Sequence, residues 1–252
     1  MRKTKIICTI GPATDSLEML ENLANAGMNV ARLNMSHGTH ESHRKVIDAI
    51  RVLNRKLNHP IAVLLDTQGP EIRTGDLAND LHLNDGDTIS IVARGAEDVE
   101  SSSIHINYED LITDVGIGDI ITVDNGLINL EVLSKEERVM QCKVLDGGLL
   151  KSKRHVNLPG IRVNLPAITD KDRRDIEFGM SLDVDFIALS FVRQAEDIHE
   201  LRELLGDKAD TIKVIAKLED QEAITNMVEI IAAADGVMVA RGDLGVEVPL
   251  EV

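Results

Sequence analysis

Residues 28–38 read Met28-Asn-Val-Ala-Arg-Leu-Asn-Met-Ser-His-Gly38, and this stretch decides the fold. Its first eight residues form one of six short runs that are rich in apolar and β-branched residues. Runs of this kind are typical of strands that are buried on both faces of a parallel sheet. The other five runs occupy residues 6–10, 61–65, 186–191, 212–218 and 237–240.

Helical periods lie between these runs, with apolar residues three or four apart in residues 17–23, 46–57, 198–205 and 224–231. The pairs Asp15 with Glu18 and Thr169 with Asp172 have the spacing of a capping box. Four glycines fall where the helices are expected to end: Gly27, Gly179, Gly206 and Gly236. The alternation of strands and helices predicts about six βα units.

A segment with a different pattern interrupts these units. It is far longer than the ~2 to 6 residues that usually connect a strand to a helix. Asn125-Gly126 separates two strand-like runs in it, which is a strong hairpin signal. We therefore predict an α/β fold: a (β/α)8-type TIM barrel, incomplete with about six βα units, formed by residues 1–69 and 167–252. Residues 70–166 are predicted to form an inserted small all-β barrel or sandwich domain that acts as a lid.

Composition excludes several classes of function. A net charge of −16 over 252 residues repels nucleic acid, and an aromatic content of 2% offers little surface on which bases can stack. No apolar stretch approaches the ~20 residues that cross a bilayer, so no membrane association is expected. The first five residues lead directly into a strand-like run rather than a signal peptide, which predicts a cytoplasmic protein. Cys8 and Cys142 are interpreted as reduced core residues.

Polar side chains follow the apolar runs, at the edge of the sheet where the active sites of (β/α) barrels lie. Residues two apart in a strand share one face, so each of three strand ends is expected to present a polar set on one side. These sets are Arg32, Asn34 and Ser36; Lys217 and Glu219; and Arg241 and Asp243. Carboxylates beside a lysine suggest a divalent metal next to a phosphate, with Mg²⁺ favoured by the oxygen ligands.

Each of these features also has a structural interpretation. A polar residue at a strand end is usually only solvated. Lys217 and Glu219 have the spacing of an internal salt bridge, and Asp243 follows a glycine as many turn residues do. His37 is expected to be structural. Surface positions are expected for the remaining histidines: His40, His43, His59, His82, His105, His155 and His199.

Taken in order, several motifs resemble the signatures of pyruvate kinases over almost the whole chain. They are Thr9-Ile-Gly-Pro12, Arg32-Leu-Asn-Met-Ser-His-Gly38, Leu65-Asp-Thr-Gln-Gly-Pro-Glu-Ile-Arg-Thr-Gly75, Asn157-Leu-Pro-Gly160, Ser190-Phe-Val-Arg193, Lys217-Leu-Glu219 and Met238-Val-Ala-Arg-Gly-Asp-Leu-Gly245. That family has an eight-stranded barrel, an inserted β domain and a C-terminal regulatory domain. The resemblance implies phosphoryl transfer from phosphoenolpyruvate to ADP in glycolysis, giving pyruvate and ATP.

The resemblance also implies roles for individual residues. Lys217 and Arg32 correspond to the catalytic residues that meet the phosphoryl group, and both also bind substrate. The backbone of Gly242 and Asp243 is implied near the substrate carboxylate. Nucleotide binding is implied for Arg73, Asn34 and His37. The implied metal ligands are Glu219 and Asp243 for Mg²⁺ or Mn²⁺, and Asn34, Ser36, Asp66 and Thr67 for K⁺.

Two further properties follow from the resemblance. Glu71 is the residue that accompanies dependence on K⁺ in this family, and the full-length protein is expected to be a cytoplasmic homotetramer. The chain departs from the family pattern at residues 123–126 and 153–156, so the resemblance supports the nucleotide contacts of the insert less well than the barrel site. The chain given ends at Val252, before the seventh and eighth strands, so residues 1–252 alone are expected to be inactive.

Two other functions stay open at this point. One is a non-catalytic fragment that only binds ligand. The other is a metal-dependent aldolase or lyase of the phosphoenolpyruvate-type barrels, which would share Mg²⁺ and a carboxylate pair.

Overall fold

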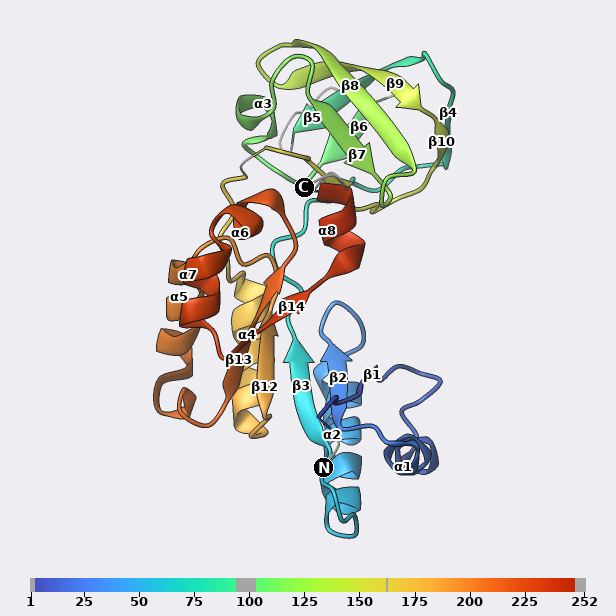
Figure 1. The fold of residues 1–252 in the computed structure, drawn as a ribbon. Coiled ribbons are helices and arrows are strands. Elements are labelled where there is room, and N and C mark those ends of the chain that lie inside the picture. The colour runs from blue at the N-terminus through green and yellow to red at the C-terminus, as the bar shows by residue number, and fades with distance from the viewer. Residues whose placement is uncertain (1–2, 94–102, 162, 248–252) are drawn as a thin grey trace. The chain divides into compact units, whose positions relative to one another are not determined.

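The computed structural model describes residues 3–93, 103–161 and 163–247 (Figure 1). The chain divides into two compact units. The first comprises Met1–Pro70, Pro166–Leu218 and Ala223–Val239, and the second comprises Glu71–Leu165, Glu219–Glu222 and Ala240–Val252. Each unit has its own hydrophobic core.

The first unit contains a curled sheet of six parallel strands in the order β1-β2-β3-β12-β13-β14. The strands are β1 (Ile7–Thr9), β2 (Val30–Asn34), β3 (Ala62–Asp66), β12 (Phe186–Leu189), β13 (Lys213–Leu218) and β14 (Gly236–Val239). Its helices are α1 (Leu17–Ala26), α2 (His40–Asn54), α4 (Asp170–Ser181), α5 (Ala195–Leu205) and α7 (Met227–Ala233), with the short η1 (Gly206–Lys208) and α6 (Gln221–Thr225). Successive βα units are confirmed, and the sheet forms part of a barrel.

A row of apolar residues crosses this sheet and faces the helices. Leu33 pairs with Leu65, Leu65 with Ile187, and Ile187 with Val214, and all four are 0% exposed. Successive residues of a strand point to opposite faces. Residues an odd number of positions from this row in the same strand therefore point to the other face, and they include Arg32, Asn34, Asp66 and Lys217.

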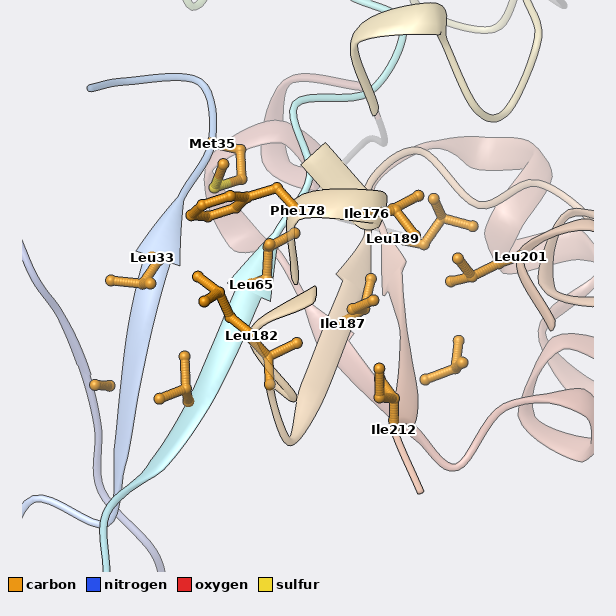
Figure 2. Close-up of a cluster of buried hydrophobic side chains, with 14 of the residues drawn as sticks. Leu33, Met35, Leu65, Ile176, Phe178, Leu182, Ile187, Leu189, Leu201 and Ile212 are labelled. Atoms are coloured by element: carbon orange, nitrogen blue, oxygen red, sulfur yellow. The ribbon is translucent and has the colours of Figure 1, made fainter. Parts of the chain in front are cut away.

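Helix α4 packs against the middle of the sheet, where Phe178 and Leu182 meet Leu65 (Figure 2). Gly179 lies inside this helix, so its prediction as a helix end was wrong. A Cβ atom at Gly179 would lie 2.8 Å from Leu65 Cδ1 and 3.3 Å from Val184 Cγ2. The glycine is therefore explained by the close approach of the helix to the sheet.

The other helix ends are mostly where the sequence predicts them. Thr169 and Asp172 form the predicted capping box of α4. The N-cap of α1 is Ser16, whose side chain accepts a hydrogen bond from the Met19 amide, so the prediction of Asp15 with Glu18 was one residue early. Gly27 and Gly206 end α1 and α5 with positive φ, whereas Gly236 begins β14 instead of ending a helix.

The second unit is built mainly of β-strands. A mixed sheet runs in the order β11-β7-β8-β9-β5-β6, and a two-stranded sheet pairs β4 with β10. The strands are β4 (Leu81–Leu83), β5 (Thr88–Ala93), β6 (Ser103–Ile106), β7 (Ile120–Val123), β8 (Ile128–Lys135), β9 (Val139–Asp146), β10 (Gly148–Leu150) and β11 (Val156–Asn157). One turn of helix, α3 (Leu111–Asp114), accompanies them.

The predicted hairpin between β7 and β8 is confirmed, with Val123 paired to Ile128. Asp124 and Asn125 both have φ of 56° and Gly126 has φ of 90°, which are the left-handed conformations that these residue types tolerate best. The loop thus has four residues.

The last described element is the helix α8 (Arg241–Glu247). Arg241 and Asp243 had been expected to share one side of a strand end, but residues two apart on a helix do not face the same way. That expectation was wrong. No helix within the described ranges is long and apolar enough to cross a membrane.

Candidate active site

Asp66 is the centre of the polar cluster at the ends of the parallel strands. Its side chain is 1% exposed and meets two cations. Arg32 Nε donates to Asp66 Oδ2, and Lys217 Nζ lies 3.2 Å from Asp66 Oδ1. A buried carboxylate is costly unless it is paired. Arg32 of the adjacent strand β2 and Lys217 of β13, two strands away, therefore stabilise it, and it fixes both of them in turn.

Lys217 is held from a second side by Ser190. Its Nζ donates to Ser190 Oγ at 2.7 Å, and Ser190 Oγ donates to the Thr67 carbonyl oxygen at 2.7 Å. The side chain of Lys217 is 10% exposed. Because little water screens this ammonium group, its attraction for an anion is stronger than at a solvated surface.

The cluster includes two residues to which the sequence-based prediction gave no role. Ser190 contacts Lys217, and Thr9 Oγ1 accepts a hydrogen bond from Arg32 Nη1 at 2.8 Å. Both directly follow or end a parallel strand at the same edge of the sheet as Asp66. Both are polar residues near the carboxyl end of an apolar run, and this is the signal that could have identified them.

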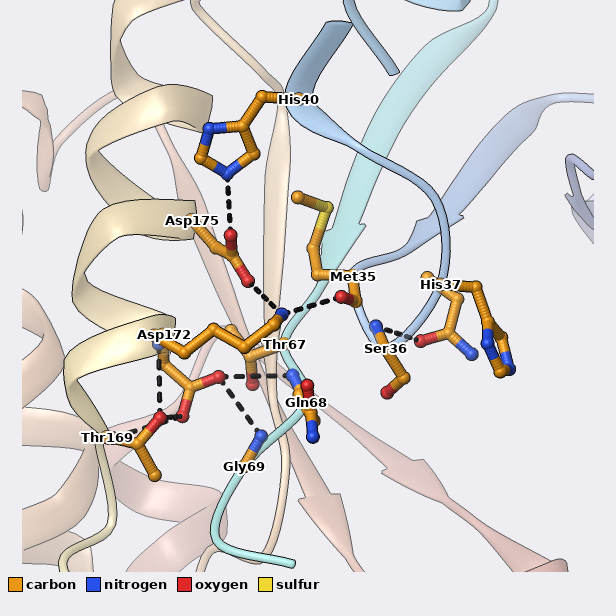
Figure 3. Close-up of polar contacts among 12 residues, drawn as sticks. Met35, Ser36, His37, His40, Thr67, Gln68, Gly69, Thr169, Asp172 and Asp175 are labelled. Atoms are coloured by element: carbon orange, nitrogen blue, oxygen red, sulfur yellow. Dashed lines mark hydrogen bonds and ion pairs between the residues drawn. The ribbon is translucent and has the colours of Figure 1, made fainter. Parts of the chain in front are cut away.

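The loops after β2 and β3 lie side by side. The Met35 amide donates to the Asp66 carbonyl oxygen at 2.9 Å. Asn34 Oδ1 accepts from the Ser36 amide at 3.0 Å (Figure 3). The residues that the sequence suggested as K⁺ ligands, Asn34, Ser36, Asp66 and Thr67, thus come from two adjoining loops.

Four of the predicted site residues belong to segments of the second unit. Glu219 is 1% exposed and directly follows β13, while Gly242 and Asp243 lie in α8. Arg73 Nε donates to Glu71 Oε2 at 2.7 Å, and its Nη1 donates to the Lys153 carbonyl oxygen at 2.9 Å. The Arg73 guanidinium is therefore positioned by its own unit.

His43 is buried and His155 half-buried, which differs from the surface positions expected for them, whereas His40 is exposed as expected. His43 is 8% exposed, and its Nε2 donates to the His37 carbonyl oxygen at 2.8 Å. His40 Nε2 donates to Asp175 Oδ1 at 2.6 Å. Burial lowers the pKa of His155, and the Glu71 carboxylate partly opposes this effect. His37 is exposed and takes part through its backbone, in line with the structural role expected for it.

Within the described ranges no group of three or more histidine, cysteine, aspartate or glutamate side chains is arranged to hold a metal. One observation nevertheless suits a cation near Asp66. Its Oδ1 is buried and accepts no hydrogen bond, although it is paired with Lys217 by charge. Carboxylate oxygens are among the donors that hard cations prefer.

The geometry defines an α/β-barrel domain with an anion-attracting site at the carboxyl ends of its strands. The model of the family "Pyruvate kinase, barrel domain" matches residues 1–252. A pyruvate kinase of Staphylococcus epidermidis is 50% identical over 253 aligned residues, and one of Staphylococcus aureus is 50% identical over 254. Both alignments cover 100% of this chain and 43% of the relative's length. The chain belongs to the pyruvate kinase family, which rules out the aldolase or lyase alternative.

Proposed function

We propose that this chain carries the phosphoryl-transfer site of a pyruvate kinase, acting on phosphoenolpyruvate and ADP. The convergence of Arg32, Asp66, Ser190 and Lys217 at one edge of the sheet is the observation that supports it. Phosphoryl transfer requires positioning and neutralisation of charge more than covalent chemistry. A buried ammonium and a guanidinium held by one carboxylate supply both.

In this mechanism Lys217 stabilises the negative charge of the phosphoryl group as it moves, and Arg32 orients the phosphate. Asp66 holds the two cations through different oxygens, Arg32 from β2 and Lys217 from β13. The preorganised arrangement costs no reorganisation during the reaction, which is the main source of electrostatic catalysis. Ser190 holds Lys217 in the geometry that the transfer needs.

The proposal includes cofactors and further ligands. Glu219 and Asp243 would hold Mg²⁺ or Mn²⁺, and Asn34, Ser36, Asp66 and Thr67 would hold K⁺. When bound, these ions neutralise substrate phosphate and carboxylate charge. Arg73, Asn34 and His37 would bind the nucleotide, and the backbone at Gly242 and Asp243 the substrate carboxylate.

We also propose that residues 70–166 act as an inserted lid domain on a barrel formed by residues 1–69 and 167–252. A cytoplasmic homotetramer is proposed for the whole protein. The alternative is a chain that only binds phosphoenolpyruvate. Measured ATP formation distinguishes a pyruvate kinase from such a binding protein.

Substitution of Lys217 tests the proposed chemistry. Lys217→Met is expected to lower kcat for ATP formation by several orders of magnitude and to leave phosphoenolpyruvate binding within about tenfold, because the ammonium acts on charge that develops during transfer. Steady-state kinetics and ligand titration of the full-length protein, with Mg²⁺ and K⁺ present, measure both quantities, since residues 1–252 alone are expected to be inactive.

Lys213→Met is the matched control, since Lys213 lies on the same face of β13 at its opposite end. It is expected to keep native kcat. Near-normal turnover of Lys217→Met would assign Lys217 to a structural salt bridge. Binding without turnover in the native protein would favour the ligand-binding alternative.

A further inference from the structure

The first turn of α4 contacts both loops that carry the proposed site. Asp172 is 0% exposed. Its Oδ2 accepts from the Thr169 amide at 3.0 Å and from Thr169 Oγ1 at 2.6 Å. Its Oδ1 accepts from the amides of Gln68 and Gly69 at 3.1 and 3.0 Å (Figure 3). The capping box uses only Oδ2 of Asp172. The other oxygen, Oδ1, is therefore available to fix the loop after β3.

That loop has little room to move. Gly69 has φ of +75°, and a Cβ atom there would lie 2.8 Å from Phe191 Cδ2 and 2.9 Å from Ser190 Cβ. Thr67 accepts from Ser190 Oγ, which in turn accepts from Lys217. A shift of residues 68–69 would therefore be passed through Thr67 and Ser190 to the ammonium group.

The neighbouring residue Lys171 fixes the loop after β2. Its Nζ donates to the Met35 carbonyl oxygen at 2.7 Å and to Asp175 Oδ2 at 2.7 Å. Asp175 is 4% exposed and also accepts from His40, whose ring stacks on Phe178 with 4.3 Å between centroids. Asp175, which anchors Lys171, is thus held by burial and by His40, and Figure 3 shows Asp175 with His40 and Met35.

We propose that Lys171 and Asp172 are positioning residues that together set the spacing of the loops after β2 and β3. This inference rests on the proposed function, because those loops carry the proposed K⁺ ligands Asn34, Ser36 and Thr67. Neither α4 residue touches the reacting atoms. They act through backbone atoms of Met35, Gln68 and Gly69, so sequence patterns of ligand residues do not reveal them.

The expected size of the effect follows from other metal sites. Residues that orient the ligands of a metal, without binding it, typically change its affinity by about 10–100-fold when they are replaced. A residue that only stabilised the helix would lower the stability of the fold without a selective change in ion affinity.

Binding of Tl⁺, a K⁺ analogue observed by thallium NMR, tests the inference without turnover. Lys171→Met is expected to weaken Tl⁺ binding by about 10–100-fold and to speed amide exchange at Met35 and Ser36. Lys171→Arg keeps a cationic donor and is expected to restore most of the affinity. Asp172→Asn is expected to weaken Tl⁺ binding and to speed exchange at Gln68 and Gly69.

Two exposed residues of the same helix provide matched controls. Asp170→Asn removes the same charge from the same helix end, and Arg174→Met removes a cation one turn on. Both are expected to bind Tl⁺ as the native protein does. If Asp172→Asn does not fold, the Tl⁺ affinities of Lys171→Met and Lys171→Arg test the inference on their own.

Native Tl⁺ affinity in a folded Lys171→Met would overturn the inference and leave the proposed function standing. A native protein that binds neither Tl⁺ nor phosphoenolpyruvate would instead refute the proposed function, and the inference with it.

Discussion

At the scale of single residues, the chemistry of the site depends on where a charge is buried rather than on how many charges there are. Asp66 is one of 43 acidic residues, yet it is 0% exposed and meets both Arg32 and Lys217. Because the carboxylate is removed from water, its pairing with these cations is both obligatory and strong. The same burial that makes the cluster costly to form makes it useful for binding an anion.

Tyr108 gives a clear test of burial in the second unit, since it is the only tyrosine of the chain and tryptophan is absent. Burial, aided by the hydrogen bond to Asp114, raises the pKa of Tyr108 to about 12. Absorbance at 295 nm is expected to show a single phenol titrating near that pH in the folded protein. In urea the same phenol is expected to titrate near pH ~10, the value of an unperturbed tyrosine.

The direction of the stability change follows from this shift. A phenol whose pKa is higher in the folded state keeps its full contribution below the unfolded pKa, and loses it as the pH rises through ~10 toward ~12. The free energy of unfolding should fall as the pH rises across this window. Tyr108→Phe is the control that should lack this slope. An equal slope in Tyr108→Phe would contradict the assignment.

At the scale of elements, the sequence predicts strands and helices well because both depend on local periodicity. All six parallel strands lie within about two residues of their predicted bounds. The predicted roles of glycine were less accurate. Gly27 ends a helix, as expected from local backbone preference, but Gly179 is required by a side chain more than a hundred residues away, which no local pattern contains.

The same limit explains what the sequence missed in the site. Lys217 was identified because it follows an apolar run, but its partner Asp66 comes from a strand two positions across the sheet. Asp172 was predicted only as a capping-box residue and Lys171 was given no role, because their contacts are to backbone atoms of distant loops. Pairing across strands is a property of the register, which single-strand patterns do not specify.

Gly179→Ala tests the explanation based on close approach. Alanine favours a helix over glycine by about 0.8–1.0 kcal/mol, so a purely local role predicts stabilisation. We expect instead a net destabilisation of about 1–3 kcal/mol, because the added methyl group would meet Leu65 in a filled core. Urea denaturation measures the difference.

Gly245→Ala is the matched control for this substitution. Gly245 is also helical, and nothing lies within 4 Å of a Cβ atom placed there. It is expected to be neutral or stabilising. Stabilisation by Gly179→Ala of the same size would show that the helix does not approach the sheet as closely as described.

At the scale of the whole molecule, the chain combines two units with separate cores. No residue belongs to both clusters of buried apolar side chains. Independent cores allow independent unfolding, so a two-state description is not expected for the chain as a whole. The polar cluster of Arg32, Asp66, Ser190 and Lys217 lies in the first unit, as do Lys171 and Asp172, whereas Tyr108 reports only on the second.

This separation leads to a prediction for unfolding. Most of the described helical residues belong to the first unit, so far-UV circular dichroism in urea follows mainly that unit, while Tyr108 fluorescence follows the second. Leu65→Ala is expected to destabilise the first transition by about 2–5 kcal/mol and to leave the fluorescence transition in place. Leu130→Ala, at an equally buried position of the second core, should do the reverse. If both substitutions moved both transitions equally, the two cores would unfold as one cooperative unit, and the hydrophobic clusters would be coupled despite sharing no residue.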